Sequence, residues 1–187
     1  MKLDPVEHHW PQIRETFATT LATNLHYAIA SIDASGAPRV TPIGSVMLNG
    51  PARGVFFQLF TAGLPKRIKR NEQIAILTVN SGRLFWFNSL RKGRFASPPG
   101  VRLNARVLGQ PREPTDREIA RFQRRVRPFK RLRGYDMLWS NAGMARDFEV
   151  LSAETVEFGA MTRGLWERTP THASVQTANS FPLGSAK

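Results

Sequence analysis

The sequence contains no cysteine, and this absence excludes several kinds of site. A chain without thiols has no disulfide, no thiolate nucleophile, no cysteine-ligated zinc site and no cysteine-held iron–sulfur cluster. Histidine is scarce too, at four residues, and the carboxylates are scattered. A serine–histidine hydrolase or a paired-carboxylate hydrolase therefore has little support, and we expect no metal site.

Long hydrophobic runs and the common nucleotide-binding motifs are also missing. The apolar stretches fall short of the ~20 residues that span a bilayer, and residues 1–10 lack the apolar core of a secretory signal. Neither G-x-G-x-x-G nor G-x-x-x-x-G-K-[ST] occurs. We therefore expect a cytoplasmic protein with no membrane partner. The shortage of nucleophiles and bases favours chemistry carried by a cofactor.

Acidic residues are few, and the basic excess is concentrated in two stretches. The 187 residues include 27 Lys and Arg against 14 Asp and Glu, a formal net charge of +13. The first stretch holds Lys66, Arg67, Lys69, Arg70, Arg83, Arg91, Lys92 and Arg94, and the second holds Arg117, Arg121, Arg124, Arg125, Arg127, Lys130, Arg131 and Arg133. Such stretches attract the phosphates of nucleotides, nucleic acids or lipids. The second repeats at three and four residues, which is typical both of a solvated helix face and of one that binds nucleic acid.

The hydrophobic pattern predicts a chain built mainly from strands. A first helix is expected to begin at Pro11, because Trp10, Ile13 and Phe17 recur at helical spacing. Strands are then predicted over residues 25–33, 39–48, 54–61, 74–80, 84–90, 101–109 and 148–158, with a short basic helix over 64–72. Successive short strands of this kind are typical of an antiparallel barrel or sandwich.

A chain of this length is normally a single domain. We expect residues 1–166 to form it, with a helical insertion near 115–140 in which Phe122 and Val126 share one face. Residues 167–187 are rich in Thr, Ser and Ala without a period. We expect a mobile tail there unless a partner subunit covers it.

Two places in the strand pattern indicate a ligand. Pro42 and Gly44 interrupt the second predicted strand, which indicates either an edge strand with a bulge or a strand beside a ligand. The third predicted strand ends at Thr61, and Lys66 and Arg67 follow on the basic helix. A hydroxyl group, a helix N-terminus and two cations would converge at one strand end. That arrangement suits a compact phosphate group better than a long polyanion.

The order of these elements resembles the pyridoxamine 5'-phosphate oxidase-like, FMN-binding split-barrel family. The matching segments are residues 25–48, 54–77 and 100–109, with the last strand near 154–158. The resemblance implies a mainly β fold with α additions: a six-stranded antiparallel split barrel with peripheral helices. It also implies a homodimer, with FMN bound in a groove between the subunits, that acts as an FMN-dependent oxidoreductase on a small-molecule substrate.

The resemblance assigns the flavin ring to the second predicted strand and the phosphate to the end of the third strand and the basic helix. The implied cofactor-binding residues are Arg39, Val40, Thr41, Pro42, Phe60, Thr61, Lys66 and Arg67. No catalytic residue is implied. The family's enzymes end in an Arg-x-His-Asp-Arg-like segment, whereas residues 161–169 hold no histidine, so the vitamin substrate is not implied. Two alternatives stay open: a related barrel that binds a deazaflavin or haem, and, less favoured, a nucleic-acid-binding protein that uses residues 117–133.

Overall fold

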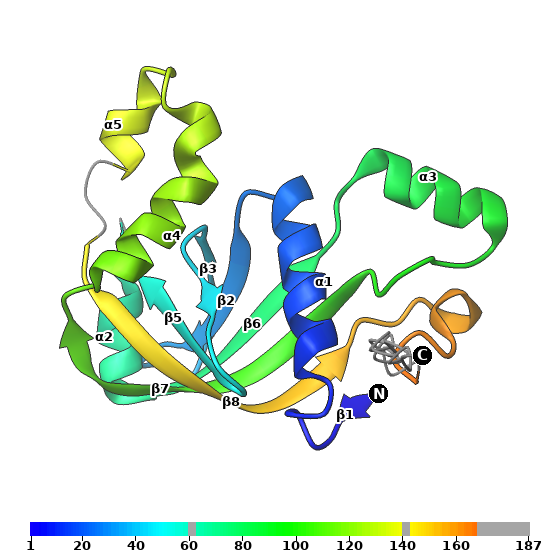
Figure 1. Cartoon of the computed structure of the whole chain (residues 1–187). Helices are drawn as coiled ribbons and strands as arrows, with labels where there is room; N and C mark the ends of the chain where they lie inside the picture. The colour runs from blue at the N-terminus through cyan, green and yellow to red at the C-terminus, as the bar shows by residue number, and fades with distance from the viewer. Residues whose placement is uncertain (60–62, 140–142, 168–187) are drawn as a thin grey trace, which may run out of the picture.

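The computed structural model describes residues 1–59, 63–139 and 143–167, and their strands form one antiparallel sheet. The order is β3 (Pro38–Ile43), β2 (Tyr27–Ile32), β6 (Gln73–Val79), β7 (Gly100–Arg112), β8 (Ala145–Thr155), β5 (Arg53–Phe57) and β4 (Met47–Leu48), and β1 (Lys2–Leu3) pairs with β8. Figure 1 shows the sheet curled into a half-barrel. β1 and β4 have two residues each. The longer strands form the six-stranded antiparallel split barrel that the family resemblance implies.

The helices lie on the faces and at the ends of this sheet. They are α1 (Trp10–Thr23), α2 (Gly63–Arg70), α3 (Arg83–Lys92), α4 (Asp116–Val126) and α5 (Gly134–Trp139), with 3-10 turns η1 (Arg127–Phe129) and η2 (Gly159–Thr162). In Figure 1, α3 and the α4–α5 pair project from opposite sides of the half-barrel, with α1 between them. In the described parts of the chain, no helix is long and apolar enough to cross a lipid bilayer.

The main core fills the concave side of the sheet. Tyr27, Ile29 and Ser31 of β2 are buried, while the alternate residues are less so, the pattern of a strand with one face on a core. Trp10, Ile13 and Phe17 of α1 enter the same cluster. The apolar stripe that the sequence predicts for the first helix is thus the stripe that holds α1 on the sheet.

The strand predicted over residues 39–48 is two strands in the structure. β3 is one edge of the sheet and β4 is the other, so the chain crosses the mouth of the barrel between them. A Cβ added at Gly44 would lie 2.9 Å from the backbone oxygen of Leu25, so a side chain there would collide. Ser45 ties the crossing to β5, since its Oγ donates to Phe57 O at 3.1 Å and accepts from Phe57 N at 2.9 Å. β3 is therefore the edge strand that Pro42 permits.

Residues 84–90, predicted as a strand, form the helix α3 instead. β6 already pairs with β2 on one side and β7 on the other, so the sheet has no place beside β6 for the next segment. Trp86 packs edge-on against Phe95 and Phe158, with ring centroids 5.2 and 5.0 Å apart. Gly93, at φ 63°, ends the helix in the left-handed conformation that glycine adopts without strain. The aromatic residues that favoured a strand thus anchor a helix.

The insertion between β7 and β8 begins with a capped helix. Thr115 Oγ1 accepts from Glu118 N, and the Glu118 carboxylate accepts from Thr115 N at 2.8 Å, which completes a capping box. Phe122 then meets Phe57 of β5 edge-on, at 5.4 Å between ring centroids. Phe56 belongs to the main core and Phe57 to a second cluster on the other side of β5. α4 therefore covers the outer side of that strand.

Candidate functional site

Arg67 of α2 reaches the two strands at the open end of the sheet. Its Nε donates to Ser31 Oγ of β2 at 2.8 Å, and its Nη2 donates to Thr41 Oγ1 of β3 at 3.0 Å. Ser31 lies on the concave side because it follows Tyr27 and Ile29 at a period of two, and Thr41 pairs with Ile29. We call these three residues the Arg67 cluster.

The remaining terminal nitrogen of the guanidinium lies at the N-terminus of α2. A Cβ added at Gly63, the first residue of α2, would lie 2.5 Å from Arg67 Nη1. A helix N-terminus presents backbone N–H groups without intrahelical partners and the positive end of the helix dipole. Among the described residues, no carboxylate forms an ion pair with Arg67. An uncompensated cation, two hydroxyls and a helix N-terminus make up a donor set that suits a phosphate.

β3 offers an open edge beside this cluster. Within the described sheet it pairs with β2 alone, so the N–H and C=O groups of its other edge are available to a ligand or to another chain. Val40 points to the convex side and is 67% exposed, and Pro42 has no N–H to donate. A flat ring system along β3 would meet mainly backbone groups.

Arg39 does not join the Arg67 cluster, although it lies directly opposite Ser31 in the β2–β3 ladder. Its Nε donates to Asp33 Oδ2 at 2.7 Å, and Asp33 Oδ1 accepts from the backbone and hydroxyl of Ser35. The Ser35 hydroxyl and Arg39 hold the pKa of Asp33 well below its ordinary value. Arg39 therefore closes the hairpin between β2 and β3.

Lys66, the other basic residue assigned to the phosphate, does not join the cluster. Lys66 is exposed on α2. One residue along a helix is a turn of about 100°, so Lys66 points in a different direction from Arg67. Phe60 and Thr61 lie outside the described residues. Of the two basic residues assigned to the phosphate, it is Arg67 that contacts the strands.

Sequence reasoning missed Ser31 and Gly63, which the structure brings beside Thr41 and Arg67. A signal for Ser31 was present. It is the third inward position of a strand whose other inward positions are Tyr27 and an isoleucine, and a hydroxyl there needs a polar partner. Gly63 had no such signal, because its role depends on the direction taken by a side chain four residues later.

Two buried nitrogen donors lie at the end of β5 that leads toward α2. Gln58 Nε2 and Arg146 Nε have no hydrogen-bond partner in the described structure. Arg146 is 6% exposed and pairs with Phe56 across the β5–β8 ladder, and burial lowers the pKa of its guanidinium. Unpaired buried donors are costly. This end of β5 would therefore also be stabilised by a polar or anionic group.

The second basic stretch is divided by the orientation of α4. Arg121 Nη2 donates to Leu48 O at 2.8 Å and Arg125 Nη1 donates to Val46 O at 2.6 Å, so both side chains turn toward the barrel. The others are exposed: Arg117, Arg124, Arg127, Lys130, Arg131 and Arg133. The stretch is therefore not one continuous cationic face.

No protein-family model and no curated protein matches the sequence, so the comparison rests on structure. The fold is similar to that of an FMN-binding protein from Syntrophomonas wolfei subsp. wolfei, with a TM-score of 0.56 and 9% identity over 80% of this chain and 88% of that chain. It is also similar to a candidate pyridoxamine 5'-phosphate oxidase from Lactobacillus delbrueckii, with a TM-score of 0.50 and 17% identity over 82% of this chain and 98% of that chain. A third similar fold is that of HupZ from Group A Streptococcus, with a TM-score of 0.50 and 15% identity over 81% of this chain and 96% of that chain. The chain therefore has the split-barrel fold of the pyridoxamine 5'-phosphate oxidase-like proteins.

Proposed function

We propose that this protein is a flavoprotein that binds FMN non-covalently and acts as an oxidoreductase on a small substrate. The observation that carries the proposal is the Arg67 cluster, where a guanidinium with no carboxylate partner among the described residues lies between two hydroxyls and the start of α2. A structurally similar protein is described as FMN-binding, which supports FMN as the ligand.

The residues present fit the phosphate end of FMN. Ser31 and Thr41 each accept a hydrogen bond from Arg67, so each hydroxyl keeps its own O–H to donate to an anionic oxygen. Arg67 Nη1 beside Gly63 and the N–H groups of the first turn of α2 add further donors. A phosphate monoester carries about −1.5 to −2 charge at pH 7 and would compensate the Arg67 cation.

The open edge of β3 fits the ring end of FMN. Bound FMN would supply hydride transfer at its ring nitrogen N5. The role of the chain is to hold the ring along β3, where the backbone groups of the unpaired edge are available. The nearest carboxylate of the hairpin, Asp33, is held by Arg39 and Ser35, so we assign the chain no catalytic acid or base.

The test compares FMN with riboflavin, which lacks the phosphate. Arg67→Ala should weaken FMN binding at least about tenfold, because a hydrogen bond to a charged group is worth about 1.5–3 kcal/mol and 1.4 kcal/mol is a factor of ten. Riboflavin binding should hardly change. Lys69→Ala, an exposed cation on the same helix, is the matched control and should leave both affinities unchanged. Adding Lys66→Ala to Arg67→Ala should add little.

Several outcomes would contradict the proposal. An equal loss of FMN and riboflavin in Arg67→Ala would mean that Arg67 acts through folding, and no loss would mean that the phosphate is held elsewhere. The absorption spectrum of the purified protein separates the other cofactors, since a deazaflavin and haem have bands distinct from those of FMN. A colourless protein that takes up no added FMN would leave the nucleic-acid alternative in its place.

A further inference from the structure

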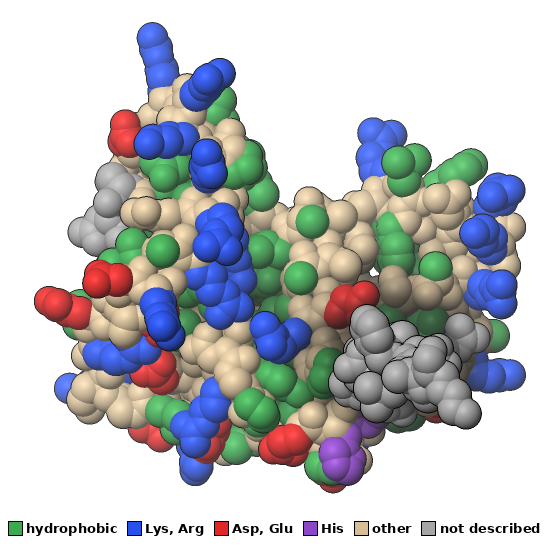
Figure 2. All heavy atoms as spheres, in the orientation of Figure 1, with side chains coloured by type: hydrophobic (Ala, Val, Ile, Leu, Met, Phe, Trp, Pro, Cys, Tyr) green, Lys and Arg blue, Asp and Glu red, His purple; other side chains and the backbone are tan. Residues whose placement is uncertain are grey.

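A cleft separates α1 from α4 at the mouth of the barrel, and none of the three residues of the Arg67 cluster lines it. It consists of two adjoining hollows of about 360 and 410 Å³ that share Ala18 of α1 and Arg125 of α4. Figure 2 shows the molecule hollowed beside the α4–α5 projection, with Lys and Arg side chains along that flank. Small-molecule sites generally have volumes of about 300–1,000 Å³.

The two hollows differ in character. One is mainly apolar, with Phe122, Phe129 and Trp139 on the α4–α5 side. The other is lined by Arg14, Arg121 and Arg125, together with the carboxylate-bearing Glu15 and the phenol of Tyr27. The cleft therefore has an aromatic end and a cationic end.

The arginines of α4 are held by neutral groups. Arg121 donates to the side-chain oxygen of Asn49 at 2.9 Å and to Leu48 O at 2.8 Å, and Arg125 donates to Val46 O at 2.6 Å. A guanidinium has five N–H donors, so most of them are not used by these bonds. Burial lowers the pKa of Arg121 and of Arg125, so taking these cations out of water is unfavourable.

Among the residues that the structure describes, no neighbouring group pairs with these cations. Tyr27 donates its O–H to Phe17 O, and burial raises its pKa to about 12, so it is neutral at pH 7. Glu15 lines the same hollow, but in the described structure it forms no ion pair with Arg121 or Arg125. The cationic end of the cleft thus keeps its charge.

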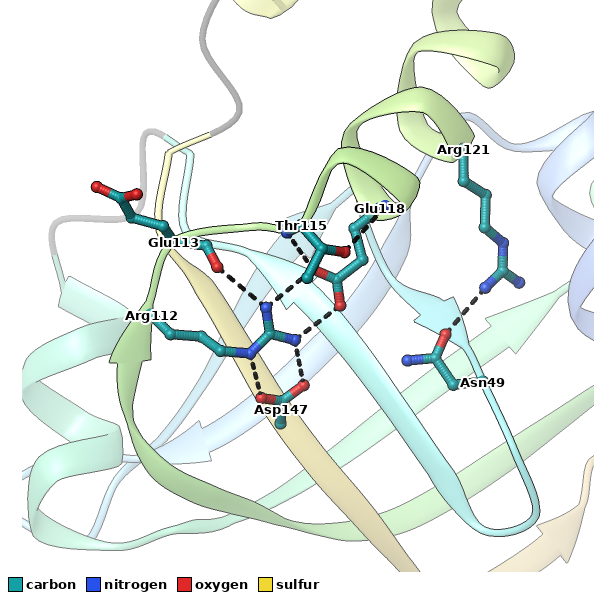
Figure 3. A network of polar contacts seen from close by, with 7 residues as sticks. All are labelled: Asn49, Arg112, Glu113, Thr115, Glu118, Arg121 and Asp147. Carbon is teal, nitrogen blue, oxygen red and sulfur yellow. Dashed lines mark hydrogen bonds and ion pairs between the residues drawn. The ribbon is translucent and has the colours of Figure 1, made fainter.

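Arg112, just before α4, shows how this chain compensates an arginine when it needs to. Asp147 and Glu118 both bond its guanidinium, at 2.6–2.9 Å (Figure 3). Among the described residues, the hydrogen bonds of Arg121 go only to the neutral oxygens of Asn49 and Leu48. Buried charges in proteins are normally paired. Since no described carboxylate pairs with Arg121 or Arg125, the contrast favours a partner from outside the chain.

We propose that the α1–α4 cleft binds a small aromatic carboxylate, with its carboxylate on Arg125 and Arg121 and its ring in the apolar hollow. Arginine binds carboxylates through paired, charge-assisted hydrogen bonds. Aromatic rings favour tilted and edge-on contacts with rings such as Phe129 and Trp139, which already pack at 5.6 Å between centroids. This ligand is separate from FMN, and its site shares no residue with the Arg67 cluster.

Isothermal titration calorimetry with 2-naphthoate tests the proposal, with the neutral 2-naphthylmethanol as the comparison. The carboxylate should bind at least about tenfold more tightly, the factor expected for one charge-assisted hydrogen bond. Arg125→Met should remove that preference for the carboxylate and leave the affinity for the alcohol unchanged. Arg124→Met, an exposed neighbour on α4, is the matched control and should behave as wild type.

A second variant closes the cleft without touching the arginines. Ala18 is exposed on α1 and lines both hollows, so Ala18→Trp should fill the space while the fold is kept. It should weaken the binding of 2-naphthoate and of 2-naphthylmethanol alike, and the thermal unfolding temperature should not change. Equal affinity for the two probes, unchanged binding by Ala18→Trp, or an equal loss in Arg124→Met would overturn the proposal. Competitive displacement of 2-naphthoate by FMN would also overturn it, because the cleft would then belong to the flavin.

Discussion

Single arginines have different roles in this chain according to the groups that they contact. Arg112 is bonded by two carboxylates, from α4 and β8, and joins the end of β7 to both elements. Arg67 is bonded by two hydroxyls and keeps its charge uncompensated by the described residues. A saturated guanidinium stabilises the fold. One that meets only hydroxyls is available to an anion.

Removing the charge of Glu118 tests the Arg112 network. Glu118→Gln keeps an oxygen for Thr115 N but weakens the bond to Arg112. We expect the free energy of unfolding at pH 7 to fall by about 1–2 kcal/mol, the value for a charged hydrogen bond reduced by the partial exposure of Arg112. The measurement is urea denaturation, with Glu113→Gln as control, since Figure 3 shows the Glu113 carboxylate pointing away from the network.

The same pair predicts a pH dependence. The hydrogen bond from Arg112 lowers the pKa of Glu118 from its ordinary 4.5. A carboxyl group with a lowered folded-state pKa contributes stability above the unfolded-state pKa and loses it as the pH falls through the folded-state pKa. The stability difference between wild type and Glu118→Gln should therefore narrow below about pH 4.5. A difference that stays constant or widens in acid would contradict this assignment.

At the scale of single residues, the sequence predicted the candidate site only in part. The resemblance assigned Thr41 to the ring strand and Arg67 to the phosphate, and the structure brings these two side chains into contact. The choice between Lys66 and Arg67 depends on where α2 begins, and a helix boundary shifts by one or two residues easily. Arg39 was assigned to the ring strand, but a carboxylate six residues earlier in the hairpin holds it.

Among the elements, strands with one face on the core were predictable and the others were not. β2 and β6 alternate buried and less buried residues, and that period is visible in the sequence. α3 was misassigned because a short run with three aromatic residues is compatible with a strand or a helix. Pairing decides between the two, and both edges of β6 are taken. The division of residues 39–48 between β3 and β4 depends on the close approach of Gly44 to Leu25, which no local pattern reveals.

The end of α3 gives a prediction at this scale. Gly93 adopts φ 63°, and an added Cβ would meet no atom within 4 Å, so the cost of Gly93→Ala is conformational only. The left-handed conformation costs a non-glycine residue about 1–2 kcal/mol. We expect Gly93→Ala to lower the free energy of unfolding by about 1 kcal/mol, with Gly93→Asn losing less because asparagine tolerates this conformation. Urea denaturation measures both, and equal losses would show that the backbone conformation is not the cause.

At the scale of the whole molecule, the convex side of the sheet is covered by a helix at one end and exposes apolar side chains at the other. Over β5, α4 covers it through Phe122. Over β2, β3 and β6, Val40 is 67% exposed and Ile32 39%, and a hollow of about 370 Å³ reaches Leu151 on β8. Leu151 is 51% exposed and is the extra residue of the β7–β8 bulge, between Val150 and Ser152. An exposed apolar surface of this kind is typical of a contact between proteins.

The family resemblance implies a homodimer, and we propose that two copies of the chain associate through this convex surface. Light scattering should give twice the 21.0 kDa chain mass. Leu151→Glu should give the mass of one chain, because association would bury the new carboxylate without a partner. Met137→Glu is the matched control, since Met137 is 78% exposed on α5, which projects from the sheet (Figure 1) and does not line this hollow. A dimeric Leu151→Glu variant would exclude this surface as the interface.

The dimer and the flavin site should be linked if FMN lies between the subunits, as the resemblance also implies. A ligand that binds the dimer alone shifts the monomer–dimer equilibrium toward the dimer. Saturating FMN should therefore lower the dimer dissociation constant measured by analytical ultracentrifugation. Leu151→Glu should weaken FMN binding, although the side chain of residue 151 lies on the other face of the sheet from Arg67. The Arg67→Ala variant should remain dimeric without FMN. Added FMN should no longer lower its dimer dissociation constant. A monomeric Leu151→Glu variant that binds FMN as tightly as wild type would contradict this link, because each subunit would then hold its cofactor alone. In that case the flavin, and not the partner subunit, would cover the open edge of β3.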